Sequence, residues 1–153
     1  MKYRICKSFH VETGHVLSKH PGRCRFPHGH SRRVDVVVAS DRLDERDMVC
    51  DFKAIKLALS EYLDQFDHAL AVNSRDPLIG RLKGSEQRLV VFDNVDPTTE
   101  VLAKRLFDHL SAAIASGQVF HDDEGAAYPL PRHLVLERVR VTETPTSWAE
   151  YGL

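Results

Sequence analysis

The sequence predicts an α+β fold in which two helices pack on one face of an antiparallel sheet. Residues 3–15, 30–40 and 133–144 alternate apolar and polar side chains, as half-buried strands do. Two other segments repeat apolar residues every three or four positions, which is typical of amphipathic helices. Two helices are too few to cover both faces of a parallel sheet, so the antiparallel arrangement is favoured.

The composition indicates one soluble domain over residues 1–153 with a local binding site. Lys and Arg number 21 and Asp and Glu 22, giving a net charge of −1 and no positive field to attract nucleic acid or a membrane. No stretch approaches the roughly 20 apolar residues that span a bilayer. Three cysteines cannot all pair, and free thiols fit a reducing compartment. We therefore expect a cytoplasmic protein.

The first half of the chain predicts two hairpins and a helix. Segments 3–15 and 30–40 are expected to pair as antiparallel strands across the loop 16–26, with Val34, Val36 and Val38 on one face. The turn-rich residues 41–45 precede the short apolar segment 48–50, which suggests a second hairpin. Asp51 is expected to cap a helix that carries one apolar face from Phe52 to Phe66.

The second half predicts a loop over 73–87, a short strand over 89–92 and a second helix. Asp96 is expected to cap that helix, Pro97 to open it and Gly117 to end it. Residues 117–132 are polar and contain proline, so they are expected to form a loop. In the last strand Glu143 ends an otherwise apolar row.

The segment C-R-F-P-H-G-H at 24–30 suggests a metal site. His28 and His30 are two apart, so on one strand both imidazoles point to the same face. Catalytic zinc usually takes three protein ligands, and His15 is the best third candidate because a hairpin brings it opposite His28. His10 and His20 remain alternatives. An isolated pair of this kind can also be two strand histidines bonded to backbone carbonyls.

Three further features carry possible chemistry. Cys24 lies where a nearby cation would favour the reactive thiolate, but it could equally be a fourth ligand or an inert cysteine. The adjacent Asp67 and His68 can form a carboxylate–imidazole relay, although such pairs often arise by chance. Glu143 needs a partner if it is buried, such as the two parallel N–H donors of a pterin or guanine edge. It could otherwise be exposed at the end of a strand.

Taken in order, these motifs resemble the family of 6-pyruvoyltetrahydropterin and 6-carboxytetrahydropterin synthases. The matching segments, which span most of the chain, are G-H-V-L at 14–17, C-R-F-P-H-G-H at 24–30, M-V-C-D-F-K at 48–53, F-D-H-A-L at 66–70, P-T-T-E at 97–100 and V-T-E-T at 141–144. The combination is much more specific than any one of them.

The resemblance implies a tunnelling-fold subunit of a homohexamer that acts on 7,8-dihydroneopterin triphosphate, with active sites between neighbouring subunits. It implies that Zn²⁺ is the cofactor. The roles it implies are zinc ligands for His15, His28 and His30, a catalytic thiol for Cys24, a pair working with that thiol for Asp67 and His68, a pterin anchor for Glu143 and pterin-pocket positions for Thr98, Thr99 and Glu100.

The favoured hypothesis is a zinc-dependent lyase, 6-carboxy-5,6,7,8-tetrahydropterin synthase, which serves the queuosine pathway. The pyruvoyl-forming lyase uses the same residues and is the nearest alternative. Side-chain cleavage toward folate precursors usually requires a glutamate near the loop cysteine, and residues 24–30 contain none. A non-catalytic, zinc-stabilised binding module is the alternative from a different class.

Overall fold

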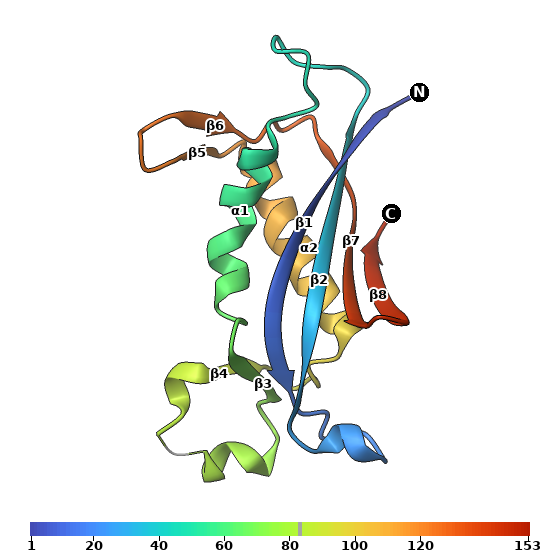
Figure 1. The fold of residues 1–153 in the computed structure, drawn as a ribbon, viewed down its shortest axis with the longest axis vertical. Helices are drawn as coiled ribbons and strands as arrows, with labels where there is room; N and C mark the ends of the chain where they lie inside the picture. Colours follow the sequence, from blue (N-terminus) through green and yellow to red (C-terminus); the bar gives the residue numbers. More distant parts are fainter. Residues whose placement is uncertain (83) are drawn as a thin grey trace.

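The computed structural model describes residues 1–82 and 84–153. Six strands form one sheet in the order β4-β3-β1-β2-β7-β8, and both helices pack on one face of it (Figure 1). The element bounds are β1 Tyr3–His15, β2 His28–Ser40, α1 Phe52–Asp64, β3 Ala69–Asn73, β4 Leu89–Phe92, α2 Thr99–Ser116, β5 Val119–His121, β6 Ala127–Pro129, β7 Val135–Thr144 and β8 Ser147–Gly152. None of these helices is long and apolar enough to cross a membrane.

The hairpin of β1 and β2 confirms the first predicted pairing and organises the molecule. The two 13-residue strands run antiparallel from the pair Tyr3–Ser40 to the pair His15–His28. Val34, Val36 and Val38 are buried on the face that the helices cover. The loop between the strands holds a short 3₁₀ helix, Arg23–Arg25. The hairpin therefore places His15, His28 and His30 at one end of the core.

The helices bury the apolar faces that their periodicity predicted. Asp51 caps α1 by accepting from the Lys53 N–H, and α2 ends at Gly117, whose φ of 62° is the left-handed conformation that glycine adopts most readily. Both helices pack into the same core as β1, β2 and β7. Full burial of one Leu or Ile side chain contributes about 1.5–3 kcal/mol, so this shared core holds the layers together.

The sheet is mixed rather than wholly antiparallel. The antiparallel prediction is confirmed for β1, β2 and β7, and β8, which was not predicted, also pairs antiparallel. β3 instead joins the free edge of β1 in parallel, and β4 joins β3 in parallel. The helix α1 carries the chain back along the sheet, so β3 enters in the direction of β1 (Figure 1). The alternation of apolar and polar side chains in such short strands does not indicate whether they pair parallel or antiparallel.

The predicted second hairpin is wrong. Residues 41–50 form a loop, in which the Asp44 carboxylate accepts from the backbone N–H groups of Arg46 and Met48. Val49 and Cys50 are buried in the core. Their apolar character reflects this packing and not a place in a strand.

Besides β3, other structured segments lie outside the predicted elements. The loop 73–87 contains the 3₁₀ helices Pro77–Arg81 and Glu86–Arg88, while Lys83 falls outside the described residues. Segment 117–132 contains the small hairpin of β5 and β6. The last strand, β8, is an exposed sheet edge and lacks an apolar alternation. These segments bury too little apolar surface to leave a periodic signal.

Asp96 does not cap α2, contrary to prediction. Thr98 is the cap and accepts from the Val101 N–H at 3.3 Å. The Asp96 carboxylate instead accepts from the Ser18 hydroxyl at 2.6 Å, the Lys19 N–H at 2.8 Å and the Asn73 amide at 3.0 Å. Asp96 thus ties the loop after β1 and the end of β3 to the turn before α2.

Candidate metal centre and substrate site

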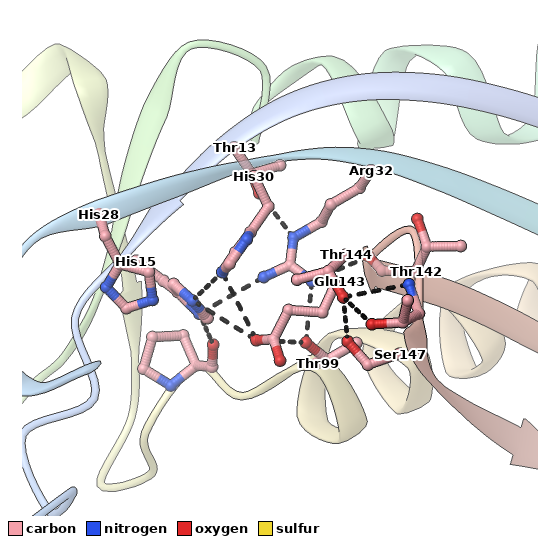
Figure 2. Close-up of polar contacts among 12 residues, drawn as sticks. Thr13, His15, His28, His30, Arg32, Thr99, Thr142, Glu143, Thr144 and Ser147 are labelled. Atoms are coloured by element: carbon pink, nitrogen blue, oxygen red, sulfur yellow. Dashed lines mark hydrogen bonds and ion pairs between the residues drawn. The ribbon is translucent and has the colours of Figure 1, made fainter. Parts of the chain in front are cut away.

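Three imidazoles converge where β1 and β2 begin to separate. His15 lies directly across from His28 in the hairpin, and His30 follows two residues later on the same face. One nitrogen of each ring lies within 4.8 Å of the others (Figure 2). Among the described residues His10 projects from the exposed side of β1, and His20 accepts from the Gly22 N–H in the loop. The structure therefore selects His15 as the third member of the cluster.

Backbone carbonyls set the tautomers of two of these rings. The Nδ1 atom of His15 lies 2.8 Å from the Pro97 carbonyl, and that of His28 lies 2.8 Å from the Phe26 carbonyl. A carbonyl oxygen only accepts, so each Nδ1 must carry the proton. Each Nε2 then presents its lone pair, which is the arrangement that metal-binding histidines usually have.

The spacing of the cluster fits a tetrahedral ion. The Nε2 atoms of His15 and His30 are 3.2 Å apart. Two ligands at about 2.0–2.1 Å from a tetrahedral Zn²⁺ lie about 3.3 Å from each other. Three neutral imidazoles are also the ligand set of one well-known type of catalytic zinc site, which keeps its fourth position open.

The surroundings favour the neutral form of His15 and His30. Burial, helped by the positive charge of Arg32, lowers the pKa of His15 to about 4 against the opposing effect of its bond to Pro97. Burial and Arg32 also lower the pKa of His30. Because only the neutral imidazole can bind a metal, His15 is ready to act as a ligand at neutral pH.

Glu143 reaches the cluster from β7, at a bulge. The register between β7 and β8 shifts between Thr142 and Thr144, so Glu143 is the extra residue whose side chain a bulge can redirect. Its Oε1 atom lies 3.6 Å from His30 Nε2 and 3.8 Å from His15 Nε2. It also accepts from the Thr99 hydroxyl at 3.1 Å. About a third of the side chain remains exposed, so a ligand can approach it.

Arg32 is the site residue that the sequence reasoning missed. Its side chain is buried among Thr13, Thr99 and the Thr142 carbonyl, next to His15 (Figure 2). Burial lowers its pKa, while the negative charges of Glu143 and Glu100 oppose that shift. An arginine on the inward face of an otherwise apolar strand is expensive to bury without partners. Its position two residues after His30 could have signalled a polar site.

Asp67 and His68 form the predicted pair. His68 Nδ1 lies 2.9 Å from the Asp67 carboxylate, whose other oxygen accepts from the Glu12 N–H at 3.0 Å. These two hydrogen bonds, that from Glu12 first, lower the pKa of Asp67. His68 adopts a φ of 53°, a strained value for a side chain of this size, and its own N–H bonds the Glu12 carbonyl at 2.7 Å.

The pair does not contact the metal cluster within the described chain. His68 lines a groove of about 510 Å³ with Leu70 and with residues of β1 and β2 that include Gly14 and Gly29. The two glycines pair across the strands, and His28 and His30 line the same groove. His68 is largely exposed there, and its Nε2 is free of the Asp67 contact.

The remaining predicted residues occupy two different settings. Cys24 is half-buried in the 3₁₀ turn between β1 and β2 and is absent from the group of converging ligand atoms found among the described residues. Thr98 caps α2, and Thr99 bonds Glu143. Glu100 is exposed in the first turn of α2 and makes no hydrogen bond to the other site residues that the structure describes. Its negative charge still acts on the site, because it opposes the lowering of the Arg32 pKa.

A family model described as 6-pyruvoyl tetrahydropterin synthase matches residues 4–152. The chain belongs to this family. A relative from Aquifex aeolicus, named 6-carboxy-5,6,7,8-tetrahydropterin synthase, is 30% identical over 99% of this chain and 98% of its own length. A relative of the same name from Synechocystis is 33% identical over 96% of this chain and 91% of its own length.

Solved structures show the same fold. An uncharacterised protein from Wolinella succinogenes has a TM-score of 0.76 at 24% identity, covering 99% of this chain and 98% of its own. A 6-pyruvoyl tetrahydropterin synthase from Plasmodium falciparum has a TM-score of 0.69 at 14% identity, covering 98% of this chain and 96% of its own. The fold expected from the sequence, an α+β tunnelling-fold subunit, is confirmed.

Proposed function

We propose that the chain is a zinc-dependent 6-carboxy-5,6,7,8-tetrahydropterin synthase. It converts 7,8-dihydroneopterin triphosphate and water to 6-carboxytetrahydropterin, acetaldehyde and triphosphate. The observation that carries the proposal is the convergence of three imidazoles beside Glu143 in a member of this family, several of whose relatives bear that name.

The three histidines hold the metal through Nε2. His15 and His28 keep their Nδ1 protons on backbone carbonyls, so their lone pairs face the ion in a fixed orientation. A bound Zn²⁺ polarises the oxygens of the substrate side chain and lowers the pKa of its hydroxyl groups. The rest of the chemistry belongs to the side chains around it.

Two groups move protons on the carbon skeleton. Cys24, kept apart from the ligand cluster, acts as a thiolate base. Asp67 fixes the Nδ1 proton of His68, which leaves the exposed Nε2 to take or give a proton. A base and an acid at opposite sides of the side chain suit a reaction that isomerises it, cleaves a carbon–carbon bond and expels triphosphate.

Glu143 holds the pterin. The edge of a pterin carries parallel N–H donors, which a carboxylate can accept as a pair. Thr99 orients this carboxylate through its hydroxyl. Thr98 and Glu100, at the start of α2, match family positions that contact the pterin. The pterin ring of the substrate is thus bound next to the metal, which binds the side chain of the substrate.

The active unit is a homohexamer whose sites lie between neighbouring subunits. His68 is largely exposed in a groove that His28 and His30 also line, and the described residues show no hydrogen bond between His68 and the three histidines. A neighbour docked in that groove would bring its own cluster to His68. This arrangement gives the Asp67–His68 pair a role that one chain alone does not offer.

Product analysis tests the reaction. Zinc-loaded protein incubated with 7,8-dihydroneopterin triphosphate should release triphosphate and acetaldehyde in equal amounts, with the mass of 6-carboxytetrahydropterin in the product. Release of triphosphate without acetaldehyde, together with the pyruvoyl product, would favour a 6-pyruvoyl tetrahydropterin synthase activity, which gives the family its description. Release of neither compound would contradict both lyase assignments and leave a zinc-stabilised binding module.

A further inference from the structure

Arg32 connects three elements at the base of the site. Its Nε–H donates to the Thr13 hydroxyl on β1 at 2.7 Å. Its Nη1 donates to the Thr99 hydroxyl in α2 at 2.8 Å and to the Thr142 carbonyl in β7 at 3.2 Å. The residue is only 2% exposed, so this guanidinium depends on these partners instead of water.

The direction of the hydrogen bonds is fixed along this chain of contacts. A guanidinium can only donate, so the Thr99 oxygen accepts from Arg32. The single hydroxyl proton of Thr99 is then free to point at Glu143 Oε1, 3.1 Å away. Glu143 must accept at Oε1, and its Oε2 accepts no hydrogen bond from any residue in the described ranges 1–82 and 84–153.

We propose that Arg32 is a positioning residue for pterin recognition, acting on Glu143 through the Thr99 hydroxyl. The inference rests on the proposed function and extends it to a residue outside the predicted ligand and catalytic sets. Arg32 contacts no substrate. It makes the Thr99 hydroxyl donate to Glu143 Oε1, which leaves Glu143 Oε2 free to accept from the N–H groups of a ligand.

Arg32 also holds the geometry at the bulge. Its bond to the Thr142 carbonyl anchors the residue directly before Glu143, and the Arg33 N–H bonds the Thr142 hydroxyl at 2.8 Å. The Thr99 contact anchors the first turn of α2 at the same point. Arg32 therefore restrains Glu143 in two ways. It bonds the backbone of the preceding residue, Thr142, and it bonds the Thr99 hydroxyl, which contacts the Glu143 carboxylate.

A binding assay with variants tests this role. The probe is 7,8-dihydroneopterin, which lacks the phosphates, and its dissociation constant is measured by pterin fluorescence with zinc-loaded Arg32→Gln, Thr99→Val and Thr99→Ser. Loss of a hydrogen bond that involves a charged group predicts about 10- to 100-fold weaker binding for the first two. Thr99→Ser keeps the hydroxyl and should bind within a few-fold of the wild type.

A double variant separates positioning from general packing. If Arg32 acts through Thr99, the loss in Arg32→Gln/Thr99→Val is smaller than the product of the two single losses. KM should rise with little change in kcat, and zinc content should stay at the wild-type level. Arg33→Gln is the matched control, because that side chain bonds Asp35 and Ser8 on the other face of β2.

Three results would overturn the inference. They are wild-type affinity in Thr99→Val, multiplicative losses in the double variant, and a wild-type chain that does not bind the pterin. If Arg32→Gln fails to fold, Thr99→Val against Thr99→Ser decides the question alone. A wild type that binds the pterin but releases no acetaldehyde contradicts the proposed reaction and leaves this inference standing.

Discussion

Single contacts decide what each polar side chain at the site can do. The Pro97 and Phe26 carbonyls hold the Nδ1 protons of His15 and His28, so the Nε2 atoms of both rings are left with a free lone pair. The sequence predicted the identity of the three histidines, since spacing alone places His28 and His30 on one face. It did not predict the carbonyl partners, because these come from a loop and a turn whose paths depend on tertiary packing.

Glu143→Gln tests the pterin anchor at this scale. The amide keeps the shape of the side chain but replaces one acceptor oxygen with a donor, which faces the donors of the pterin edge. We expect kcat/KM to fall about 10- to 100-fold, mainly through KM, because charged hydrogen bonds contribute about 1.5–3 kcal/mol. Steady-state kinetics measure this change. Glu137→Gln, which removes the partly buried partner of the exposed Arg4, should leave kcat/KM unchanged. Equal effects in the two variants would contradict the anchor role.

At the scale of elements, the periodicity of the sequence predicted the strands and helices that pack in the core. It missed the segments whose structure depends on polar contacts. The strands β1, β2 and β7 and both helices carry long apolar faces, so their patterns were readable. The short strand β4 was predicted with its observed bounds, whereas β3 and the exposed edge β8 are short or polar and were missed. Val49 and Cys50 gave a false strand signal because an apolar pair in a buried loop resembles a short strand.

The polar contacts of Asp96 were also missed by the sequence analysis, and they lead to a prediction about the stability of the fold. Its burial would raise its pKa, but hydrogen bonds from Ser18, Asn73 and Lys19 outweigh burial and lower the pKa below its usual value of 3.8. A lowered pKa in the folded state means that ionised Asp96 stabilises the fold above pH 4, and that this contribution is lost as the pH falls through the folded-state pKa.

Asp96→Asn should therefore reduce the free energy of unfolding by about 1–3 kcal/mol at pH 7. The difference from the wild type should shrink as the pH drops below about 4. Urea unfolding at pH 7 and at pH 3 measures both values. Asp123→Asn, an exposed carboxyl in the turn between β5 and β6, is the control and should change stability by less than about 0.5 kcal/mol. A pH-independent loss in Asp96→Asn would contradict this account.

At the scale of the whole molecule, one chain presents two groups of polar side chains that make no hydrogen bond to each other among the described residues. His15, His28 and His30 converge beside Glu143, while the Asp67–His68 pair lies at a groove that His28 and His30 also line. The hexamer proposed above brings these parts together between subunits. Only the family resemblance implied a site shared between subunits, because residue spacing along one chain does not indicate how copies of the chain pack.

Subunit complementation tests the shared site. Cys24→Ala and His68→Ala hexamers should each be inactive. After joint dissociation and reassembly at equal amounts, random mixing predicts that roughly a quarter of the sites combine an intact Cys24 with an intact His68. Activity should recover to about that fraction of the wild type, and size-exclusion chromatography with light scattering checks that hexamers formed. No recovery in well-formed mixed hexamers would show that both residues serve the same chain.

The most direct test of the account compares metal content and turnover in two variants. The central claim is that His28 holds zinc, while Cys24 is kept from the metal to carry protons. Metal analysis should find one zinc per chain in Cys24→Ala, with turnover of 7,8-dihydroneopterin triphosphate lost. His28→Ala should lose zinc and turnover together while keeping the folded circular dichroism spectrum. Loss of zinc in Cys24→Ala with zinc retained in His28→Ala would contradict the account.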